Sequence, residues 1–218
     1  MILCVYGAGG SGKTVIDLAK IVNKETQHWE KIVFVDDVIA EKECYGLEVY
    51  SFKSFISKFS KQAVEFVISS GEPQVRKLLY QKVKEEGYLF ANLIHPEAEI
   101  SENVKLGEGV IVARAWISGP TIIGDNTGIS QNAIIGHDTR IGEHSMISPG
   151  VFVAGECKIG ECVYIGPHAA IKDRINVGNT AIVGMSAAVY KDIPAGHTAI
   201  GNPARNLQRA NEKNVFKK

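Results

Sequence analysis

The sequence IGDNTGISQNAIIGHDTRI at positions 123–141 has an isoleucine at every sixth position. A small residue follows most of these aliphatic residues, and a compact residue such as Thr127 or Ala133 comes four positions after them. The spacing continues through twelve aliphatic residues: Ile123, Ile129, Ile135, Ile141, Ile147, Val153, Ile159, Ile165, Ile171, Val177, Val183 and Val189. A period of six fits neither a helix nor a single strand. It predicts a left-handed parallel β-helix, in which three short strands make each coil and stacked coils bury one another's aliphatic side chains.

In this prediction the aliphatic residue points into the prism, the small residue forms the tight corner and the compact residue fills the interior. An earlier run, Ile94, Ile100, Leu106 and Val112, has the same period. It is out of register by one residue with Ile117, so we expect an irregular turn at 116–120. An ordinary β-sandwich with chance spacing is the alternative.

The first ninety residues show a different pattern, in which strands and helices alternate. Apolar strands are expected at 2–6, 31–35 and 63–69, with a helix after the glycines at 7–12 and further helices at 51–58 and 75–84. This alternation predicts an α/β domain with a small Rossmann-like parallel sheet. The expected domains are therefore 1–90 (Rossmann-like), 91–205 (β-helix) and a C-terminal tail at 206–218.

The glycine-rich stretch GAGGSGKT at 7–14 fits two phosphate-binding motifs. Gly7, Gly9 and Gly12 match the dinucleotide pattern GxGxxG, whereas Gly7, Gly12, Lys13 and Thr14 match the triphosphate loop GxxxxGK[ST]. Because the predicted sheet is small, we favour a site that binds a nucleotide diphosphate over a nucleoside-triphosphatase domain. A third interpretation is that the glycines only pack helix against strand.

The composition excludes several classes of partner. Lysine plus arginine equals aspartate plus glutamate, so no basic field favours nucleic acid or an anionic membrane. No apolar run approaches the ~18 residues of a membrane span, and no signal peptide precedes the first strand. The four cysteines form no CxxC pair. We expect a cytoplasmic protein with reduced thiols and no structural zinc.

His137 is the candidate catalytic residue because of its neighbours. It follows Gly136 at a predicted corner and precedes Asp138, and Gly155 should lie beside it one coil further on. A carboxylate on one ring nitrogen fixes the tautomer and raises the basicity of the other, which suits a general base. The glycine leaves room for a substrate. The alternative is an exposed histidine with a casual neighbour.

The other chemically active side chains are expected to be structural or solvated. His144 and His168 are predicted on the outside of a coil, and Cys157 points inward. The histidine spacing gives no closely paired ligands, so no metal site is expected. The remaining histidines are His28, His95 and His197.

Together, the glycine-rich domain, the hexapeptide repeat, Gly-His-Asp at 136–138, DIPAG at 192–196 and GNPAR at 201–205 resemble the bacterial sugar acetyltransferases of the PglD/NeuD type. Among these, the chain is most similar to the nucleotide-amino-sugar N-acetyltransferases. The resemblance implies a homotrimer with sites between neighbouring β-helices. It also implies acetyl-CoA as donor and, as acceptor, the amine of a nucleotide-linked amino sugar, such as a 4-amino-4,6-dideoxy sugar, in surface glycan or glycoprotein biosynthesis.

The resemblance also implies roles for individual residues. His137 would be the base and Asp138 its partner; relatives can carry a histidine where this chain has Met146. An O-acetyltransferase for a sialic-acid-like sugar and a non-catalytic nucleotide-binding scaffold remain alternatives. The implied substrate-binding residues are Gly9, Gly10, Ser11, Asp36, Asp37 and Gly71. The implied acetyl-CoA-binding residues are Met146, Gly155, Pro167, Gly184 and Met185.

Overall fold

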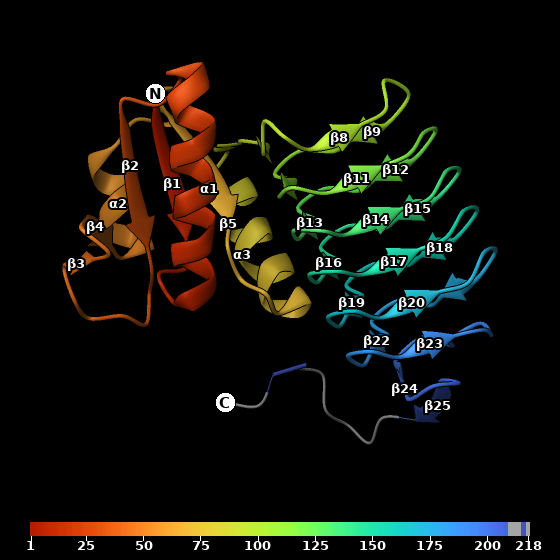
Figure 1. Ribbon diagram of the computed structural model, residues 1–218. Coiled ribbons are helices and arrows are strands. Elements are labelled where there is room, and N and C mark those ends of the chain that lie inside the picture. The colour runs from red at the N-terminus through yellow and green to blue at the C-terminus, as the bar shows by residue number, and fades with distance from the viewer. Residues whose placement is uncertain (209–214, 217–218) are drawn as a thin grey trace.

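The structure, a computed structural model, describes residues 1–208 and 215–216. It has two parts, an α/β domain, here called the cap, and a three-sided β-helix beside it (Figure 1). Both expected architectures are confirmed. The tail expected at 206–218 lies mostly outside the described residues, and its first part belongs to strand β25 (Arg205–Gln208).

The cap contains one six-stranded sheet in the order β3-β4-β2-β1-β5-β6. Its pairs are parallel except β3–β4. That hairpin was not predicted; it turns at Tyr45 and Gly46, both with positive φ, as a tight two-residue hairpin requires. The strands are β1 (Ile2–Tyr6), β2 (Lys31–Val35), β3 (Glu43–Cys44), β4 (Leu47–Tyr50), β5 (Val64–Ile68) and β6 (Leu89–Phe90).

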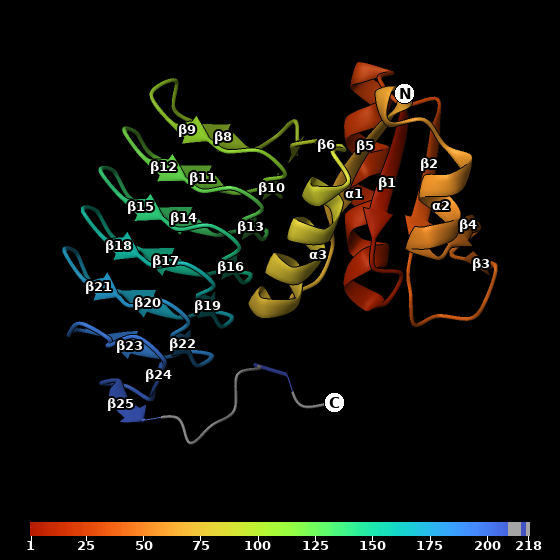
Figure 2. The ribbon, with the colours of Figure 1, turned by 180° about the vertical axis from the view of Figure 1, so that it is seen from behind.

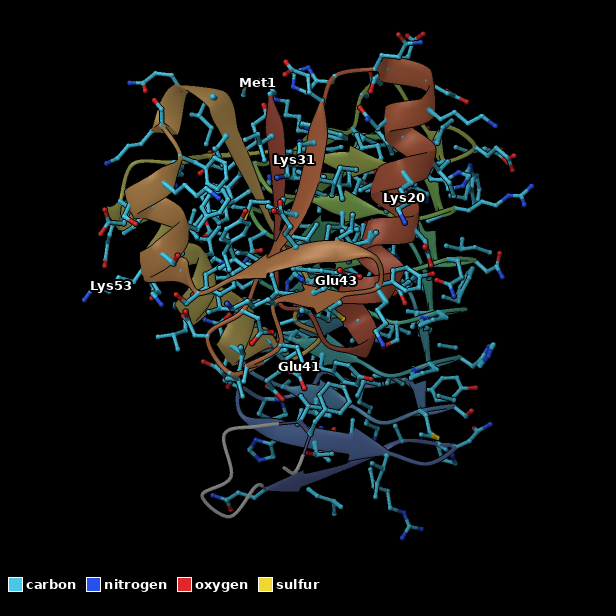
Figure 3. The ribbon with its side chains drawn as sticks, turned by 90° about the vertical axis from the view of Figure 1, so that its left-hand side faces the viewer. Met1, Lys20, Lys31, Glu41, Glu43 and Lys53 are labelled. Carbon is cyan, nitrogen blue, oxygen red and sulfur yellow. The ribbon has the colours of Figure 1, made fainter. Side chains whose placement is uncertain are left out.

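Helices cover both faces of this sheet. Helix α1 (Gly10–Thr26) packs on one face. The hydrophobic cluster between α1 and the sheet also includes Leu93 and Ile111 of the β-helix. Helices α2 (Phe52–Lys58) and α3 (Pro73–Glu85) cover the other face. A short 3-10 helix (Lys61–Ala63) lies between α2 and β5. Figure 3 shows α1, marked by Lys20, and α2, marked by Lys53, on opposite sides of the sheet.

The β-helix has three sheets, one on each side of the prism. The cap-facing sheet contains β7 (Leu93–Ile94), β10 (Ile111–Val112), β13 (Gly128–Ile129), β16 (Met146–Ile147), β19 (Tyr164–Ile165), β22 (Ile182–Val183), β24 (His197–Ile200) and β25. The front sheet contains β8 (Glu99–Ile100), β11 (Trp116–Ile117), β14 (Ile134–Ile135), β17 (Phe152–Val153), β20 (Ala170–Ile171) and β23 (Ala188–Val189). The rear sheet contains β9 (Lys105–Leu106), β12 (Ile122–Ile123), β15 (Arg140–Ile141), β18 (Lys158–Ile159) and β21 (Asn176–Val177).

The repeated aliphatic residues fill the prism as predicted, stacked in register from coil to coil. The predicted role of the small residues was wrong. The left-handed backbone of the corners falls two positions later, for example at Asn126 (φ 53) and Asp138 (φ 57). The small residue is needed because a Cβ on Gly124 would lie 2.7 Å from the backbone nitrogen of Glu143 in the next coil.

The expected register slip exists, but it lies earlier than predicted. Trp116 pairs regularly with Ile134, and Val112 pairs with Ile94. The turn between β10 and β11 is therefore one residue shorter than its neighbours, at 113–115. The strands keep their register because the turn absorbs the difference.

Helix α3 docks on the edge between the rear and cap-facing sheets. Lys77 forms an ion pair with Glu161 at 2.5 Å, and the Tyr80 ring lies 5.1 Å from that of His144. His144 lies on the outside of its coil, as predicted, but α3 covers this corner and leaves the side chain only 3% exposed. The repeat alone does not reveal which corners the cap covers. The Asn126 side-chain amide donates to His144 Nδ1 at 3.0 Å, and burial lowers the pKa of His144 to about 4.

Candidate active site

His137 lies in the turn between β14 and β15, on the edge between the front and rear sheets. Its Nδ1–H donates to Asp138 Oδ2 at 2.7 Å. The left-handed backbone at Asp138 turns the chain at this corner. Because Nδ1 carries the proton in this hydrogen bond, Nε2 is left as the acceptor nitrogen. Both side chains are more than half exposed, so a reactant can reach them.

Gly155 lies against the imidazole from the next coil, as predicted. A Cβ at Gly155 would lie 2.7 Å from His137 Nε2, so the glycine keeps space open at the acceptor nitrogen. The backbone N–H of Glu156 donates to the His137 carbonyl at 2.8 Å and fixes the stacking of the two corners. The arrangement holds an exposed imidazole with one defined tautomer at a corner whose backbone is hydrogen-bonded to the next coil.

The glycine loop at the carboxyl end of β1 combines packing positions with open ones. A Cβ at Gly12 would lie 2.0 Å from the Gly7 carbonyl oxygen, so this glycine serves helix packing. Gly9 and Gly10 have open space around them, and no side chain caps the start of α1. Ser11 Oγ donates to the Ser69 carbonyl at 2.6 Å. The free N–H groups of this helix start suit a phosphate.

The two aspartates at the end of β2 reach the same sheet edge, but their oxygens already have partners. Asp36 accepts from the Ala8 N–H at 2.8 Å and from two N–H groups of the following turn. Asp37 accepts from the Tyr6 hydroxyl and from Lys82 Nζ, both at 2.6 Å. Burial opposes ionisation of Asp37, yet these hydrogen bonds hold its pKa below the usual value. Both carboxylates therefore shape the glycine loop and the strand ends.

A cavity of about 260 Å³, here called the junction cavity, lies between the first turns of α1 and the cap-facing sheet. Ser11 and Thr14 line it from the cap, and Gln131 and Met146 line it from the β-helix. Arg76 also lines it and is 1% exposed. We did not predict Arg76, because an arginine in an amphipathic helix is typical of a solvated surface. Gly71, predicted as a ligand contact, follows β5 at the same edge of the sheet.

The predicted acetyl-CoA residues occupy three separate places on one chain. Met146 lies on the cap-facing sheet, and Pro167, Gly184 and Met185 lie in turns between the cap-facing and front sheets. Gly155 lies on the edge between the front and rear sheets, beside His137. That edge is opposite the cap-facing sheet; Figure 2 shows β13 beside the cap and β15 on the far side. One chain therefore does not bring His137 to its own cap.

The described part of the chain offers no group of three or more His, Cys, Asp or Glu side chains arranged to hold a metal ion. Within residues 1–208 and 215–216, none of the helices combines the length and apolar character needed to cross a membrane.

Two family models match the chain. The PglD N-terminal domain matches residues 2–83, and the bacterial transferase hexapeptide (six repeats) matches residues 120–155. GDP-perosamine N-acetyltransferase of Escherichia coli O157:H7 is 31% identical over 136 residues, which are 62% of this chain. The match spans 61% of the length of that enzyme.

Several solved structures resemble nearly the whole chain, among them the following two. The acetyltransferase domain of PglB from Neisseria gonorrhoeae FA1090, in complex with acetyl coenzyme A, is 30% identical with a TM-score of 0.88, covering 94% of this chain and 98% of that one. PerB from Caulobacter crescentus, in complex with CoA and GDP-perosamine, is 29% identical with a TM-score of 0.86, covering 95% and 97%.

Proposed function

The chain belongs to the PglD-type sugar acetyltransferases with hexapeptide repeats, and from this premise we propose that it transfers acetyl from acetyl-CoA to the amine of a nucleotide-linked amino sugar. The observation that carries the proposal is the His137–Asp138 pair facing Gly155. The GDP-perosamine bound in the C. crescentus structure supports a sugar of the 4-amino-4,6-dideoxy class.

In the proposed reaction His137 is the general base. Its Nε2 removes a proton from the sugar amine as the amine attacks the thioester carbonyl, a carbon–nitrogen bond forms, and the carbon–sulfur bond breaks to release CoA. No acyl-enzyme forms, so the protein contributes positioning and one base. Asp138 orients the imidazole and stabilises its protonated form.

We further propose a homotrimer, because one chain cannot bring its cap to its own His137. Support comes from an apolar row on the front sheet, in which Trp116 and Phe152 are 49% and 45% exposed on either side of Ile134. Such a row on a sheet face favours burial against another copy. With the front sheets packed around a threefold axis, the edge bearing His137 meets the edge bearing Pro167 of a neighbour.

The test measures acetyl transfer by the His137→Ala protein with GDP-perosamine and acetyl-CoA, monitored as release of the free thiol of CoA. Loss of a general base should lower kcat by about 10²- to 10⁴-fold. His28→Ala serves as the control, because His28 pairs with Glu65 on the cap, away from the glycine loop. Near-normal turnover by a folded His137→Ala protein would refute the assignment.

A further inference from the structure

Helix α3 runs alongside the stacked coils and contacts one edge of the prism (Figure 2). At that edge, between the rear and cap-facing sheets, consecutive coils turn at 107–110, 124–127, 142–145 and 160–163. One helix turn advances about 5.4 Å and stacked strands are about 4.8 Å apart, so side chains one turn apart on α3 meet the corners of successive coils. The height of the cap on the prism therefore depends on which α3 side chain meets which corner.

The ion pairs along this edge do not determine that height. Lys84 pairs with Glu108 at 2.7 Å and Lys77 with Glu161 at 2.5 Å, and all four side chains are at least one third exposed. Each of the four corners carries a carboxylate: Glu108, Asp125, Glu143 and Glu161. If the cap moved by one coil in either direction, one of the two lysines would still meet a carboxylate. Exposed ion pairs are also weak in water, so these pairs hold α3 at the edge without selecting one coil.

Asn126, in contrast, makes hydrogen bonds that fit only one position of the cap. Its side chain is fully buried at the second of these corners. Its Oδ1 accepts from Arg76 Nη2 at 3.1 Å, and its Nδ2 donates to the Arg76 carbonyl at 3.1 Å and to His144 Nδ1 at 3.0 Å. The Asn126 carbonyl also accepts from Arg76 Nε–H at 3.0 Å. The oxygen and both N–H groups of the amide are therefore all used.

Arg76 carries this connection into the cap. Its Nη1 donates to the carbonyls of Ile68 and Ser70, at 2.8 and 2.9 Å, at the carboxyl end of β5. One coil before and one coil after Asn126 the same corner position holds Glu108 and His144, and neither has an amide NH₂ group for the Arg76 carbonyl. Buried polar groups that lose their partners are costly, so displacement of the cap by one coil is disfavoured.

We propose that Asn126 and Arg76 are positioning residues, which fix the height of the cap on the β-helix and thereby the place where the acceptor meets His137. This inference rests on the proposed function. Buried polar residues select one register in coiled coils for the same reason. A shift by one coil would move the acceptor by about 5 Å, whereas reacting atoms must approach to about 3 to 3.5 Å.

The argument also holds between chains of the proposed trimer. Rotation about an axis parallel to the β-helix leaves the height of every residue unchanged. The contacts of Asn126 within one chain would therefore also fix the height of its cap relative to His137 of the neighbouring subunit.

The first experiment compares kcat with nucleotide binding in Asn126→Gly, which removes the amide and keeps a left-handed backbone that glycine adopts freely. In the acetyl-transfer assay with GDP-perosamine, kcat should fall by about tenfold or more. The dissociation constant of GDP should change by less than about threefold, because the proposed nucleotide-binding residues belong to the cap. Wild-type kcat in a folded Asn126→Gly protein would overturn the proposal.

Two controls accompany this variant. Thr180→Gly is the matched control, because Thr180 is exposed and has the same left-handed backbone (φ 59) three coils further along the edge. It should leave kcat and GDP binding unchanged. The double variant Lys77→Gln/Lys84→Gln removes both ion pairs and should also keep kcat; a loss equal to that of Asn126→Gly would overturn the proposal.

The second experiment measures amide hydrogen exchange in the free protein. In Asn126→Gly, exchange should rise by about tenfold in peptides covering 73–85 and 142–148 and stay unchanged in a peptide covering 2–6. A purely structural role would raise exchange in all three, so a uniform rise, or no rise, would overturn the proposal.

Asn126→Asp serves for both measurements if the glycine variant does not fold. Aspartate keeps an acceptor for Arg76 but has no N–H for the Arg76 carbonyl, so it should give smaller changes of the same kind, about threefold. Wild-type kcat and exchange in this variant would then overturn the proposal. Because hydrogen exchange requires no acetyl transfer, a protein that shows the expected exchange but transfers no acetyl group would refute the proposed function alone.

Discussion

His144 should make the stability of the protein depend on pH between neutrality and pH 4. Its pKa is about 4 in the folded protein, against 6.5 for an ordinary histidine. As the pH falls below 6.5 the unfolded chain binds a proton that the folded chain does not, so the free energy of unfolding decreases until the pH reaches about 4. The difference between these values corresponds to about 3 kcal/mol, and the 3% exposure of His144 leaves little solvent to reduce it.

The assay is urea unfolding at one fixed protein concentration from pH 7.5 to pH 4.5, for the wild type and for His144→Gln. Glutamine does not titrate, and its side-chain oxygen can still accept from Asn126. The variant should be less stable at pH 7.5, because it loses the ring packed against Tyr80. Its curve should fall less steeply, and the two curves should converge by about 2 to 3 kcal/mol at pH 4.5. Parallel curves across this range would refute the burial of a neutral histidine at the junction.

Three further outcomes are expected from single substitutions. Gly155→Ala would place a Cβ 2.7 Å from the His137 imidazole. The kcat of the acetyl-transfer assay should therefore fall by about 100-fold with little change in the thermal midpoint of unfolding. An unchanged kcat would contradict this geometry. Phe152→Lys on the front sheet should dissociate the proposed trimer in sedimentation velocity, whereas Lys158→Ala on the rear sheet should not. If the Phe152→Lys protein is still a trimer, this face is not the interface. Ile135→Ala should lower the free energy of unfolding, measured in urea, by about 2 to 5 kcal/mol because Ile135 is fully buried. A loss under about 1 kcal/mol would show instead that the prism collapses around the cavity left by the missing side chain.

The β-helix was predictable because one period carries its whole geometry. The same spacing identifies the interior residues and places Gly155 one coil after His137, so this neighbour of His137 followed from counting. The burial of His144 did not follow, since every corner of a repeat looks alike until another domain covers one of them. Whether a corner histidine is solvated or neutral and buried depends on α3, about sixty residues away in sequence.

The cap was predictable as a fold but less so as a site. The glycine loop and the aspartates reach the expected sheet edge, yet no motif distinguishes a carboxylate that is free for a ligand from one that accepts from its own backbone, as Asp36 does. Arg76 carries no signal at all in the sequence. Its burial depends on hydrogen bonds to carbonyls that come from β5 and from a β-helix corner, which no sequence pattern brings together.

The shortened turn at 113–115 shows how this architecture tolerates change in length. A residue is missing there, yet the coils above and below keep their pairing. Insertions and deletions at the edges are thus confined to the turn in which they occur, while the same change inside a strand would exchange its inward and outward side chains. The number of residues in a corner turn can therefore change over evolution without moving the corner that carries His137 relative to the coils. Gain or loss of a whole coil on the N-terminal side of that corner would instead change its distance from the start of the prism in one step.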